Sequence, residues 1–383
     1  SAPAPLRMAM VGGAAPSMIG PVHRIAATLD RRFDLVAAIP SRDAARGIAA
    51  GAEWGIAPDR IYATPEAMLA GERGRIDAVA ICTPNDSHYA YTKAALEAGL
   101  HVMLDKPLCN DAREGAELAR LARDKGLVLA LTHAYAGYPM VREARMRVAA
   151  GEIGDIRIVL VEYLGSGLAR RVEDGPDAAR RWRLRPEISG PSLVLGDIGT
   201  HAHHLACFVS GRRMAQVSAE VGTLMPGRLV HDYAQLRFRL DGGGTGSLIA
   251  TQAAAGAQND ISVRVFGTTG HVAWRQSTRD YLTIAGLDGE SRIVEAGSPL
   301  LSANALRASR IKRTGHTEGL HEAFANLYAD FADLILAWRR GEKTNAAAPD
   351  LPLAEDGVEG LNFVAAALAS SAAGGKTVDV ARA

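Results

Sequence analysis

The fold is decided by residues 6–20, which read LRMAMVGGAAPSMIG. The apolar run from Arg7 to Val11 is typical of a buried strand, and the glycines after it let the backbone turn tightly into a helix expected to begin near Gly20. In such a loop the backbone can approach a pyrophosphate closely, and the free N–H groups at the helix start attract its negative charge. The stretch therefore predicts the first strand, turn and helix of a dinucleotide-binding unit.

The spacing of these glycines leaves a second interpretation open. More residues separate Gly13 from Gly20 than the motif G-x-G-x-x-G allows, so an ordinary strand-to-helix turn is the alternative. The alternation of strands and helices around the loop favours the nucleotide site. The loop residues that we expect to contact the coenzyme are Gly12, Gly13, Ser17, Met18 and Ile19.

Short apolar runs alternate with amphipathic stretches as far as Thr132, which is the pattern of βαβ units on a parallel sheet. The runs carry few charges, so we expect strands that are buried on both faces. The predicted strands are Arg7–Val11, Phe33–Ile39, Ala78–Thr83, His101–Leu104 and Val128–Thr132. Helices are expected to begin near Gly20, Asp43, Pro65, Asn85, Asp111 and Pro139.

After Ile153 the rhythm changes to strands joined by turns, which indicates an antiparallel sheet. The segments 241–244 and 267–270 have the composition of hairpin turns. Helical periodicity over His321–Arg339 and Asp356–Ser371 predicts two C-terminal helices that pack back on the protein. The predicted strands are Ile156–Gly165, Ala215–Gly222, Tyr233–Leu240, Gly246–Gln252, Ser262–Gly267, Gly270–Gln276 and Leu282–Ala285.

Length and composition narrow the class of protein. A chain of 383 residues is long enough for two domains. The 43 Lys and Arg residues balance 42 Asp and Glu residues, which argues against nucleic acid or an anionic membrane as partner and for a small molecule. Three widely spaced cysteines, no leader in Ser1–Pro5 and no long apolar run predict a cytoplasmic protein without a membrane span.

Two separated motifs carry acid/base chemistry. Asp105-Lys106-Pro107 follows an apolar strand, and the proline keeps Lys106 out of the helical region, so its ammonium can point into a crevice at the strand's carboxyl end. If the segment from Asp197 is helical, His201 lies on the same face, where the carboxylate can orient the ring. We predict Lys106, Asp197 and His201 as catalytic; a packing histidine and a solvated lysine are the alternatives.

The coenzyme is expected to meet the ends of the second, third and fourth strands. After the second strand, Ser41 and Arg42 stand where an NAD site often has an acidic residue for the ribose hydroxyls. They would also suit a 2′-phosphate, so NAD and NADP both remain open. For His88 a plain helix position is the alternative. The other expected contacts are Thr83, Pro84, Asn85, His88, Asp105 and Lys106.

Taken together, these motifs resemble the glucose-fructose oxidoreductase/inositol dehydrogenase (Gfo/Idh/MocA) family over nearly the whole chain. The motifs that carry the resemblance are the loop 12–20, Thr83-Pro84-Asn85 with His88, residues 99–102, Asp105-Lys106-Pro107 and residues 197–201. The levoglucosan dehydrogenase-like branch is the most similar, on residues 19–24, 137–139, 182–183 and 315–319.

The resemblance implies a Rossmann domain with a doubly wound parallel sheet over residues 1–134. It implies an α+β domain over 135–383, with a large, open, mostly antiparallel sheet that joins a homodimer or homotetramer; the C-terminal helices can pack back on the first domain. The activity implied is nicotinamide-dependent oxidation of a secondary hydroxyl of a sugar, anhydrosugar or inositol to a ketone, the 3-hydroxyl of a glucose-like ring being one candidate. By the same resemblance Lys106 is the catalytic lysine, Asp197 orients the substrate, His201 is the acid/base group, and NAD is slightly favoured.

Two departures from the family pattern stand out. Asp105 replaces the usual glutamate before the lysine, and His204 stands where many members carry aspartate. The shorter acid could shift contacts to the nicotinamide ribose or amide, and we expect a cis Lys106–Pro107 bond.

Substrate contacts and metal binding complete the predictions. Trp182 can stack on an apolar sugar face and Arg183 can donate to hydroxyls, which leaves an acidic or phosphorylated sugar open. Tyr135 is expected at the same pocket, with core packing as the alternative; the remaining substrate contacts are Lys106, Asp197 and His201. Zinc is the alternative for the group of His201, His203 and His204 with Cys207 a turn later, in which His201 and His204 would share a helix face with Asp197. No fourth ligand is evident nearby, and alcohol oxidation with a lysine needs no metal, so we predict none.

Two other functions use the same residues. One is the redox and elimination chemistry of NAD-dependent glycosidases, in which the hydride is returned after the glycosidic bond breaks. The other is a non-catalytic, nicotinamide-binding regulator, which the retention of Lys106, Asp197 and His201 disfavours.

Overall fold

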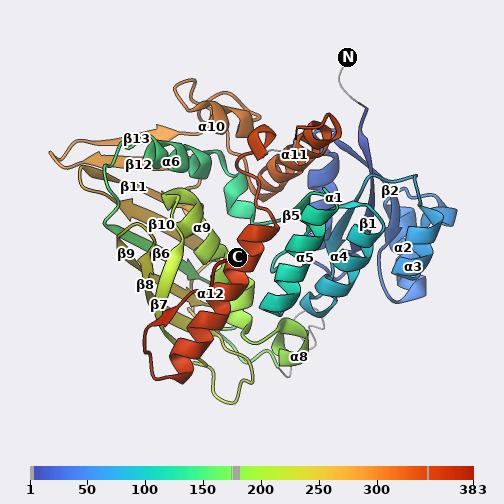
Figure 1. The fold of residues 1–383 in the computed structure, drawn as a ribbon, viewed down its shortest axis with the longest axis horizontal. Helices are drawn as coiled ribbons and strands as arrows, with labels where there is room; N and C mark the ends of the chain where they lie inside the picture. Colours follow the sequence, from blue (N-terminus) through green and yellow to red (C-terminus); the bar gives the residue numbers. More distant parts are fainter. Residues whose placement is uncertain (1–3, 174, 176–181, 343–344) are drawn as a thin grey trace. The chain divides into compact units, whose positions relative to one another are not determined.

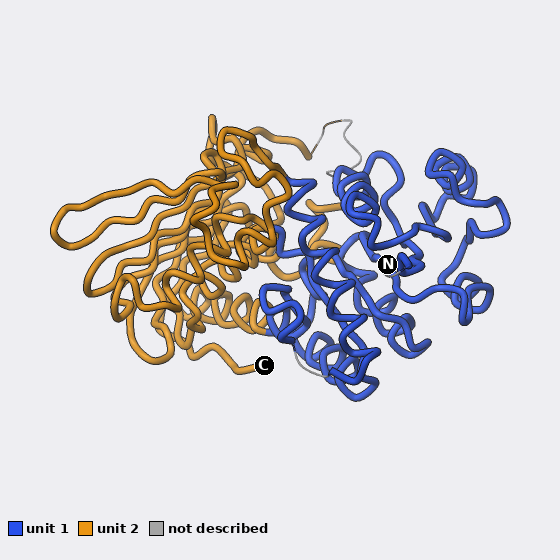
Figure 2. The backbone as a smooth tube through the Cα atoms, turned by 90° about the horizontal axis from the view of Figure 1, so that it is seen from above, with its two compact units in different colours: residues 1–134, 320–358 blue, residues 135–319, 359–383 orange. Residues whose placement is uncertain are grey.

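The computed structural model describes residues 4–173, 175, 182–342 and 345–383, so the first three residues of the Ser1–Pro5 stretch lie outside it. The chain forms two compact units (Figure 2). The first comprises Ser1–Ala134 and Leu320–Val358, and the second comprises Tyr135–Gly319 and Glu359–Ala383. The segment Leu320–Val358, far from Ala134 in the sequence, therefore belongs to the first unit.

The first unit is built on a parallel sheet with the strand order β2-β1-β3-β4-β5 (Figure 1). Strands β3 to β5 are buried along their whole length, as their uninterrupted apolar sequences require. The strands are β1 Leu6–Gly12, β2 Phe33–Ile39, β3 Ala78–Cys82, β4 His101–Leu104 and β5 Leu129–Leu131. The helices are α1 Ile19–Leu29, α2 Ala44–Glu53, α3 Pro65–Gly71, α4 His88–Glu97, α5 Ala112–Asp124 and α11 Leu320–Arg339. Helix α12, Ala354–Ala372, begins in this unit.

The strand order reverses between β1 and β3. Helices therefore leave these two neighbouring strands toward opposite faces, which opens a crevice at their carboxyl ends. Gly12 ends β1 and Thr83 follows β3, so the predicted coenzyme residues flank this crevice.

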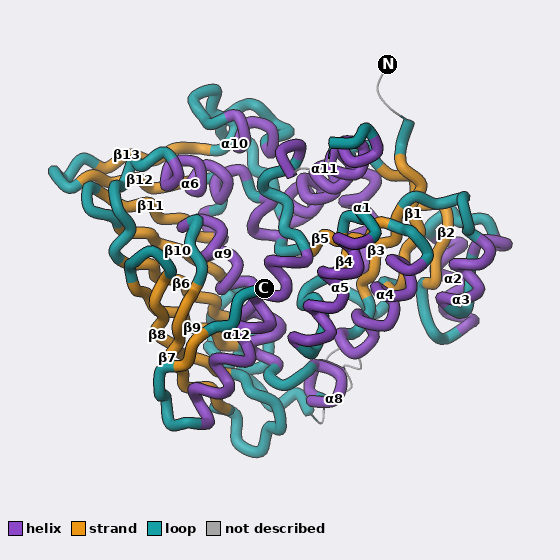
Figure 3. Tube along the Cα trace, in the orientation of Figure 1, coloured by secondary structure: helices purple, strands orange, loops and turns teal. Residues whose placement is uncertain are grey.

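The second unit contains a nine-stranded sheet with the order β13-β12-β11-β10-β6-β9-β8-β7-β14 (Figure 3). Helices α6 and α9 pack on strands β6, β10 and β11. The strands are β6 Ile158–Leu164, β7 Met214–Gly222, β8 Tyr233–Leu240, β9 Thr245–Thr251, β10 Asp260–Phe266, β11 Gly270–Arg275, β12 Tyr281–Gly286, β13 Ser291–Glu295 and β14 Val378–Asp379. The helices are α6 Pro139–Ala149, α8 Pro186–Ser189, α9 Thr200–Ser210 and α10 Ala303–Ala308.

Both sheets confirm the predicted fold class. Strands β6 and β9 pair in parallel, so the second sheet is mixed and mostly antiparallel, as expected. The edge strands β13 and β14 were not expected from the sequence, because Ser291–Glu295 has few apolar residues and Val378–Asp379 is very short. In the described part of the chain, no helix combines the length and the hydropathy of a membrane span.

Candidate active site

The glycine loop is held in a conformation that other residues rarely adopt. Gly12 and Gly13 have φ angles of 87° and 94°. A Cβ atom on Gly20 would lie 2.1 Å from the carbonyl oxygen of Gly13, so helix α1 packs directly against the loop. The Ser17 hydroxyl accepts a hydrogen bond from the Gly20 N–H at 3.0 Å. This backbone fits the close approach that a pyrophosphate needs at a helix start.

We expect the Gly20→Ala substitution to lower the free energy of unfolding by roughly 1–3 kcal/mol, because the methyl group has no space beside Gly13. It should also weaken coenzyme binding, since the loop must move away from α1. Urea unfolding and calorimetric titration with NAD measure both effects. Gly222→Ala is the matched control, because a Cβ there meets no atom within 4 Å. Equal behaviour of the two variants would contradict the close-approach argument.

At the end of β2, the polar groups bind one another. The Ser41 hydroxyl accepts hydrogen bonds from the Asp43 N–H at 3.1 Å and the Arg46 Nε at 3.0 Å. The Asp43 carboxylate accepts from the Arg46 N–H at 2.8 Å and so caps α2. Arg42 is exposed. The Asp43 carboxylate, two residues after Ser41, is thus engaged in capping α2.

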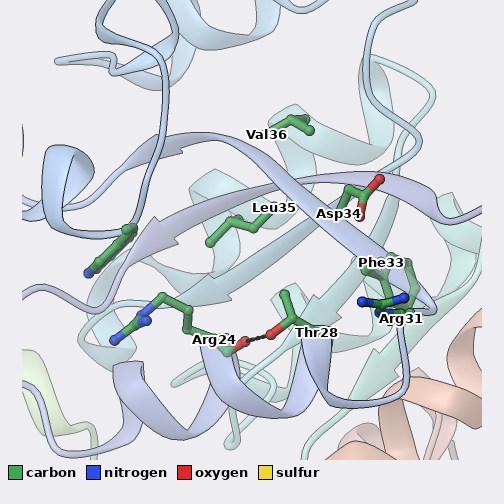
Figure 4. Close-up of a pocket in the computed structure, with 8 residues that line it drawn as sticks. Arg24, Thr28, Arg31, Phe33, Asp34, Leu35 and Val36 are labelled. Atoms are coloured by element: carbon green, nitrogen blue, oxygen red, sulfur yellow. Dashed lines mark hydrogen bonds between the residues drawn. The ribbon is translucent and has the colours of Figure 1, made fainter.

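A surface hollow of about 520 Å³ lies between α1 and the amino-terminal half of β2, lined by Arg24, Asp34 and Trp54 among others (Figure 4). Ser41 and Arg42 follow the opposite end of the same strand. The hollow is therefore separate from the residues predicted to bind the coenzyme.

His88 is completely buried behind the ends of β3 and β4. Its Nδ1 lies 2.7 Å from the Pro107 carbonyl oxygen and its Nε2 lies 2.9 Å from that of Thr83. Burial lowers the pKa of His88, and a neutral imidazole donates to only one of these carbonyls at a time. The ring thus supports the backbone of the two loops. Asn85 is also buried, whereas Thr83 and Pro84 are half-buried and Met18 is exposed.

Asp105 and Lys106 follow β4, and the Lys106–Pro107 bond is cis. The Asp105 carboxylate accepts a hydrogen bond from the Thr132 hydroxyl at 2.7 Å and lies 3.7 Å from the Nε2 of His23. Burial alone would raise the pKa of Asp105, but His23, Lys106 and Thr132 together hold it well below its usual range. The carboxylate beside Lys106 is therefore ionised at neutral pH.

In the second unit, His201 packs against two tyrosines. Its ring centroid lies 5.1 Å from that of Tyr135 and 6.2 Å from that of Tyr163. The Tyr135 hydroxyl lies 2.8 Å from the Tyr163 hydroxyl and 3.2 Å from the Gln276 Oε1. Burial is the main cause that raises the pKa of Tyr163 to about 12, and the charge of Asp197 adds to it. His201, Tyr135, Tyr163 and Gln276 thus form one polar cluster, and the charge of Asp197 acts on both tyrosines.

The relation between Asp197 and His201 was conditional on a helix from Asp197, and this condition is met only in part. Leu195–Gly199 forms a π-helical turn, with bonds that span five residues, and α9 begins only at Thr200. The expected i,i+4 relation of an α-helix therefore does not describe Asp197 and His201. Such wide turns within helices are frequent at functional sites.

Trp182 and Arg183 lie beside Asp197. The Arg183 Nε is 4.0 Å from the Asp197 Oδ2, and its guanidinium carbon is 4.6 Å from the centre of the Trp182 ring. Arg183 thus lies between Trp182 and Asp197, while Tyr135 and His201 contact each other. Gln276, directly after β11, was not identified from the sequence; a polar residue at a strand end was the available signal.

The rings of His203 and His204 pack against aromatic side chains. The ring of His203 stacks on Phe363 at 4.6 Å and that of His204 stacks on Phe208 at 5.5 Å. Burial, followed by the charge of Arg213, lowers the pKa of His203 to about 3. Among the residues that the structure describes, no three His, Cys, Asp or Glu side chains are arranged to hold a metal ion.

The depressed pKa of His203 predicts acid sensitivity. Between pH 6.5 and about 3 the unfolded chain takes up a proton that the native protein does not bind, so the free energy of unfolding falls as the pH falls. The limit is roughly 1.4 kcal/mol per pH unit for this group. His203→Phe should make the fall shallower, as measured by urea unfolding at several pH values. His316→Phe is the control, because His316 is exposed. If the free energy of unfolding depends on pH equally in both variants, His203 is not the cause of the acid sensitivity.

Comparison with known proteins identifies the family. Residues 6–133 match the model of the "Oxidoreductase family, NAD-binding Rossmann fold", and residues 141–273 match the "GFO/IDH/MocA C-terminal domain". The "Uncharacterized oxidoreductase YfiI" of Bacillus subtilis is 34% identical over 374 residues, which cover 94% of this chain and 93% of the relative. The chain belongs to the Gfo/Idh/MocA family. The sequence-based resemblance is thereby confirmed, and the protein is a nicotinamide-dependent oxidoreductase.

Solved structures of the Gfo/Idh/MocA family agree with this fold. An inositol dehydrogenase homolog from Azotobacter vinelandii, complexed with NADH and myo-inositol, is 35% identical with a TM-score of 0.90, over 98% of this chain and 97% of that one. Levoglucosan dehydrogenase in complex with NADH and levoglucosan is 25% identical with a TM-score of 0.83, over 99% and 100% of the two chains.

Proposed function

We propose that this oxidoreductase converts a secondary hydroxyl of a sugar, anhydrosugar or inositol to a ketone, with NAD or NADP as acceptor. The observation that carries the proposal is the cluster of Asp197, His201 and Tyr135 beside Trp182 and Arg183. A polyol needs such a wall of aromatic faces and hydrogen-bonding groups. The family relatives with bound myo-inositol and levoglucosan support a cyclic polyhydroxylated substrate.

The chemistry assigns a role to each catalytic side chain. Oxidation of an alcohol requires a base to take the hydroxyl proton while a hydride leaves the carbon. His201 takes this proton, and the negative charge of Asp197 favours the imidazolium that results. The Lys106 ammonium donates to the substrate oxygen and stabilises the negative charge that develops on it. When bound, the nicotinamide ring supplies the hydride acceptor.

A substrate panel tests the proposal. The purified protein is incubated with myo-inositol, levoglucosan, glucosides, and acidic and phosphorylated sugars, each with NAD and with NADP, while the absorbance of the reduced coenzyme is followed. We expect reduction with at least one cyclic polyol, and a rate at least about 100-fold lower with His201→Asn. Coenzyme binding without reduction across the whole panel would overturn the proposal and favour a regulator. Cleavage of a glycoside without net reduction would favour the redox and elimination chemistry instead.

Coenzyme preference follows from the end of β2. A carboxylate at position 41 would accept the ribose hydroxyls of NAD and repel the 2′-phosphate of NADP. We therefore expect Ser41→Glu to raise the ratio of kcat/KM for NAD over NADP by about tenfold or more, equivalent to roughly 1.4 kcal/mol. Ser41→Ala removes the hydroxyl without adding charge and is the control. An unchanged ratio in Ser41→Glu would place the 2′ position elsewhere.

We also infer a cytoplasmic homodimer or homotetramer that is joined through the open face of the nine-stranded sheet. Buried and exposed residues alternate along β8, and Ile158 and Ile293 are 42% and 68% exposed on β6 and β13. Exposed apolar residues on a sheet face favour burial against a second copy. Light scattering after size-exclusion chromatography tests the assembly. A monomer at micromolar concentration would rule it out.

A further inference from the structure

His23 is a buried polar residue in the middle of helix α1. Its side chain is completely shielded from solvent, and its ring lies edge-on to Phe324, with centroids 5.3 Å apart. The Nδ1 of His23 lies 2.8 Å from the hydroxyl oxygen of Tyr328. Both aromatic residues belong to α11, which packs along α1 (Figure 1). One side of the imidazole is thus fixed by a helix from the other end of the chain.

The opposite nitrogen lies near the Asp105-Lys106-Pro107 segment that follows β4. The Nε2 of His23 lies 3.7 Å from the Asp105 Oδ1, which is ion-pair distance but longer than a hydrogen bond. Within the described residues this nitrogen has no hydrogen-bond partner. An unsatisfied polar atom costs free energy in a buried site, and an apolar side chain would fill the space without that cost. Packing alone therefore does not account for an imidazole here.

The contact with Tyr328 determines which nitrogen of His23 can donate toward Asp105. When the Tyr328 hydroxyl donates to Nδ1, the ring carries a proton on Nε2, and this N–H lies at ion-pair distance from the Asp105 carboxylate. The same carboxylate accepts from the Thr132 hydroxyl at 2.7 Å. The hydrogen bond from Thr132 and the ion-pair contact with His23 then define where the carboxylate lies, and Lys106 is the next residue.

We propose that His23 is a positioning residue for the oxidation: anchored by Tyr328, it holds Asp105 so that the adjacent Lys106 ammonium is directed at the substrate oxygen. The proposal rests on the proposed function, in which Lys106 donates to that oxygen. Its physical basis is that a catalytic group needs neighbours that fix its rotamer, because a small displacement of the donor weakens the developing contact. The shorter Asp105, where the family resemblance expects glutamate, gives the carboxylate less reach of its own.

Two amide substitutions separate positioning from packing. Asparagine can place an amide near Nδ1 but cannot reach Asp105, whereas glutamine can place an amide N–H near Nε2. We expect His23→Asn to lower kcat by about 10- to 100-fold, with less than about threefold change in the KM of the substrate and the Kd of NAD. His23→Gln should recover kcat to within about threefold of the wild-type value. Melting temperatures of both variants report folding.

Thr132→Val is the second arm, since it keeps the side-chain shape and removes the hydrogen bond that Thr132 donates to Asp105. We expect kcat to fall in this variant too, again without a matching rise in KM. If His23→Asn and His23→Gln lose activity and stability to the same extent, or if kcat is unchanged in His23→Asn, the positioning role is refuted while the oxidation stands. If the wild-type protein oxidises no polyol, the proposed function fails and this role fails with it.

Discussion

Replacing Lys106 with methionine should lower kcat for polyol oxidation by about 10²- to 10³-fold. Methionine keeps an unbranched apolar stem but removes the ammonium, so the oxygen that gains negative charge loses a charged donor. The effect belongs in kcat, because the donor interacts more strongly with the developing alkoxide than with the neutral alcohol. Steady-state kinetics with the best substrate of the panel measure it, and calorimetry checks that NAD still binds.

Lys93→Met provides the matched control within the same unit. Lys93 lies on α4 and pairs with Glu117 at 2.7 Å, at the surface and without a predicted role in the reaction. Its loss should leave kcat within about twofold of the wild-type value, as expected for an exposed ion pair. A Lys106→Met variant as active as Lys93→Met would remove the lysine from the mechanism.

Much of the first unit was predictable because its strands are short, apolar and largely buried. The apolar runs of β2 and β4 contain few charges, and their predicted bounds, Phe33–Ile39 and His101–Leu104, agree with the structure. In β8 the strict alternation of buried and exposed residues made Tyr233–Leu240 equally clear. Patterns of this kind depend only on local periodicity, which the sequence carries directly.

The features that could not be predicted from the sequence depend on contacts between residues that are far apart in the chain. The amphipathic pattern of α11 predicts a helix but not that Tyr328 meets His23, 305 residues earlier in the chain. The residues of the π-helical turn at Leu195–Gly199 also occur in α-helices, so local propensity does not distinguish the two kinds of turn. His88 was predicted at the coenzyme, yet its two backbone contacts depend on how the ends of β3 and β4 come together.

His201→Asn should reduce kcat by about 10²- to 10⁴-fold, because the amide cannot accept the hydroxyl proton. Asparagine remains polar and smaller than the imidazole, so the contacts of Tyr135 with Tyr163 and Gln276 can persist. The residual rate should lose the acid limb of the wild-type pH profile, since the base that must be deprotonated is gone. Initial rates across the pH range measure both effects.

The control stands on the same helix. His203 stacks on Phe363, and His203→Phe should leave kcat within about threefold of the wild-type value at pH 7, since it removes no acid/base group of the reaction. Wild-type kcat in His201→Asn, or an equal loss in His203→Phe, would exclude His201 as the base.

The double variant His201→Asn with Lys106→Met tests whether both residues act on one hydroxyl. Groups that serve the same transition state lose less together than the product of their separate losses, whereas independent groups lose the full product.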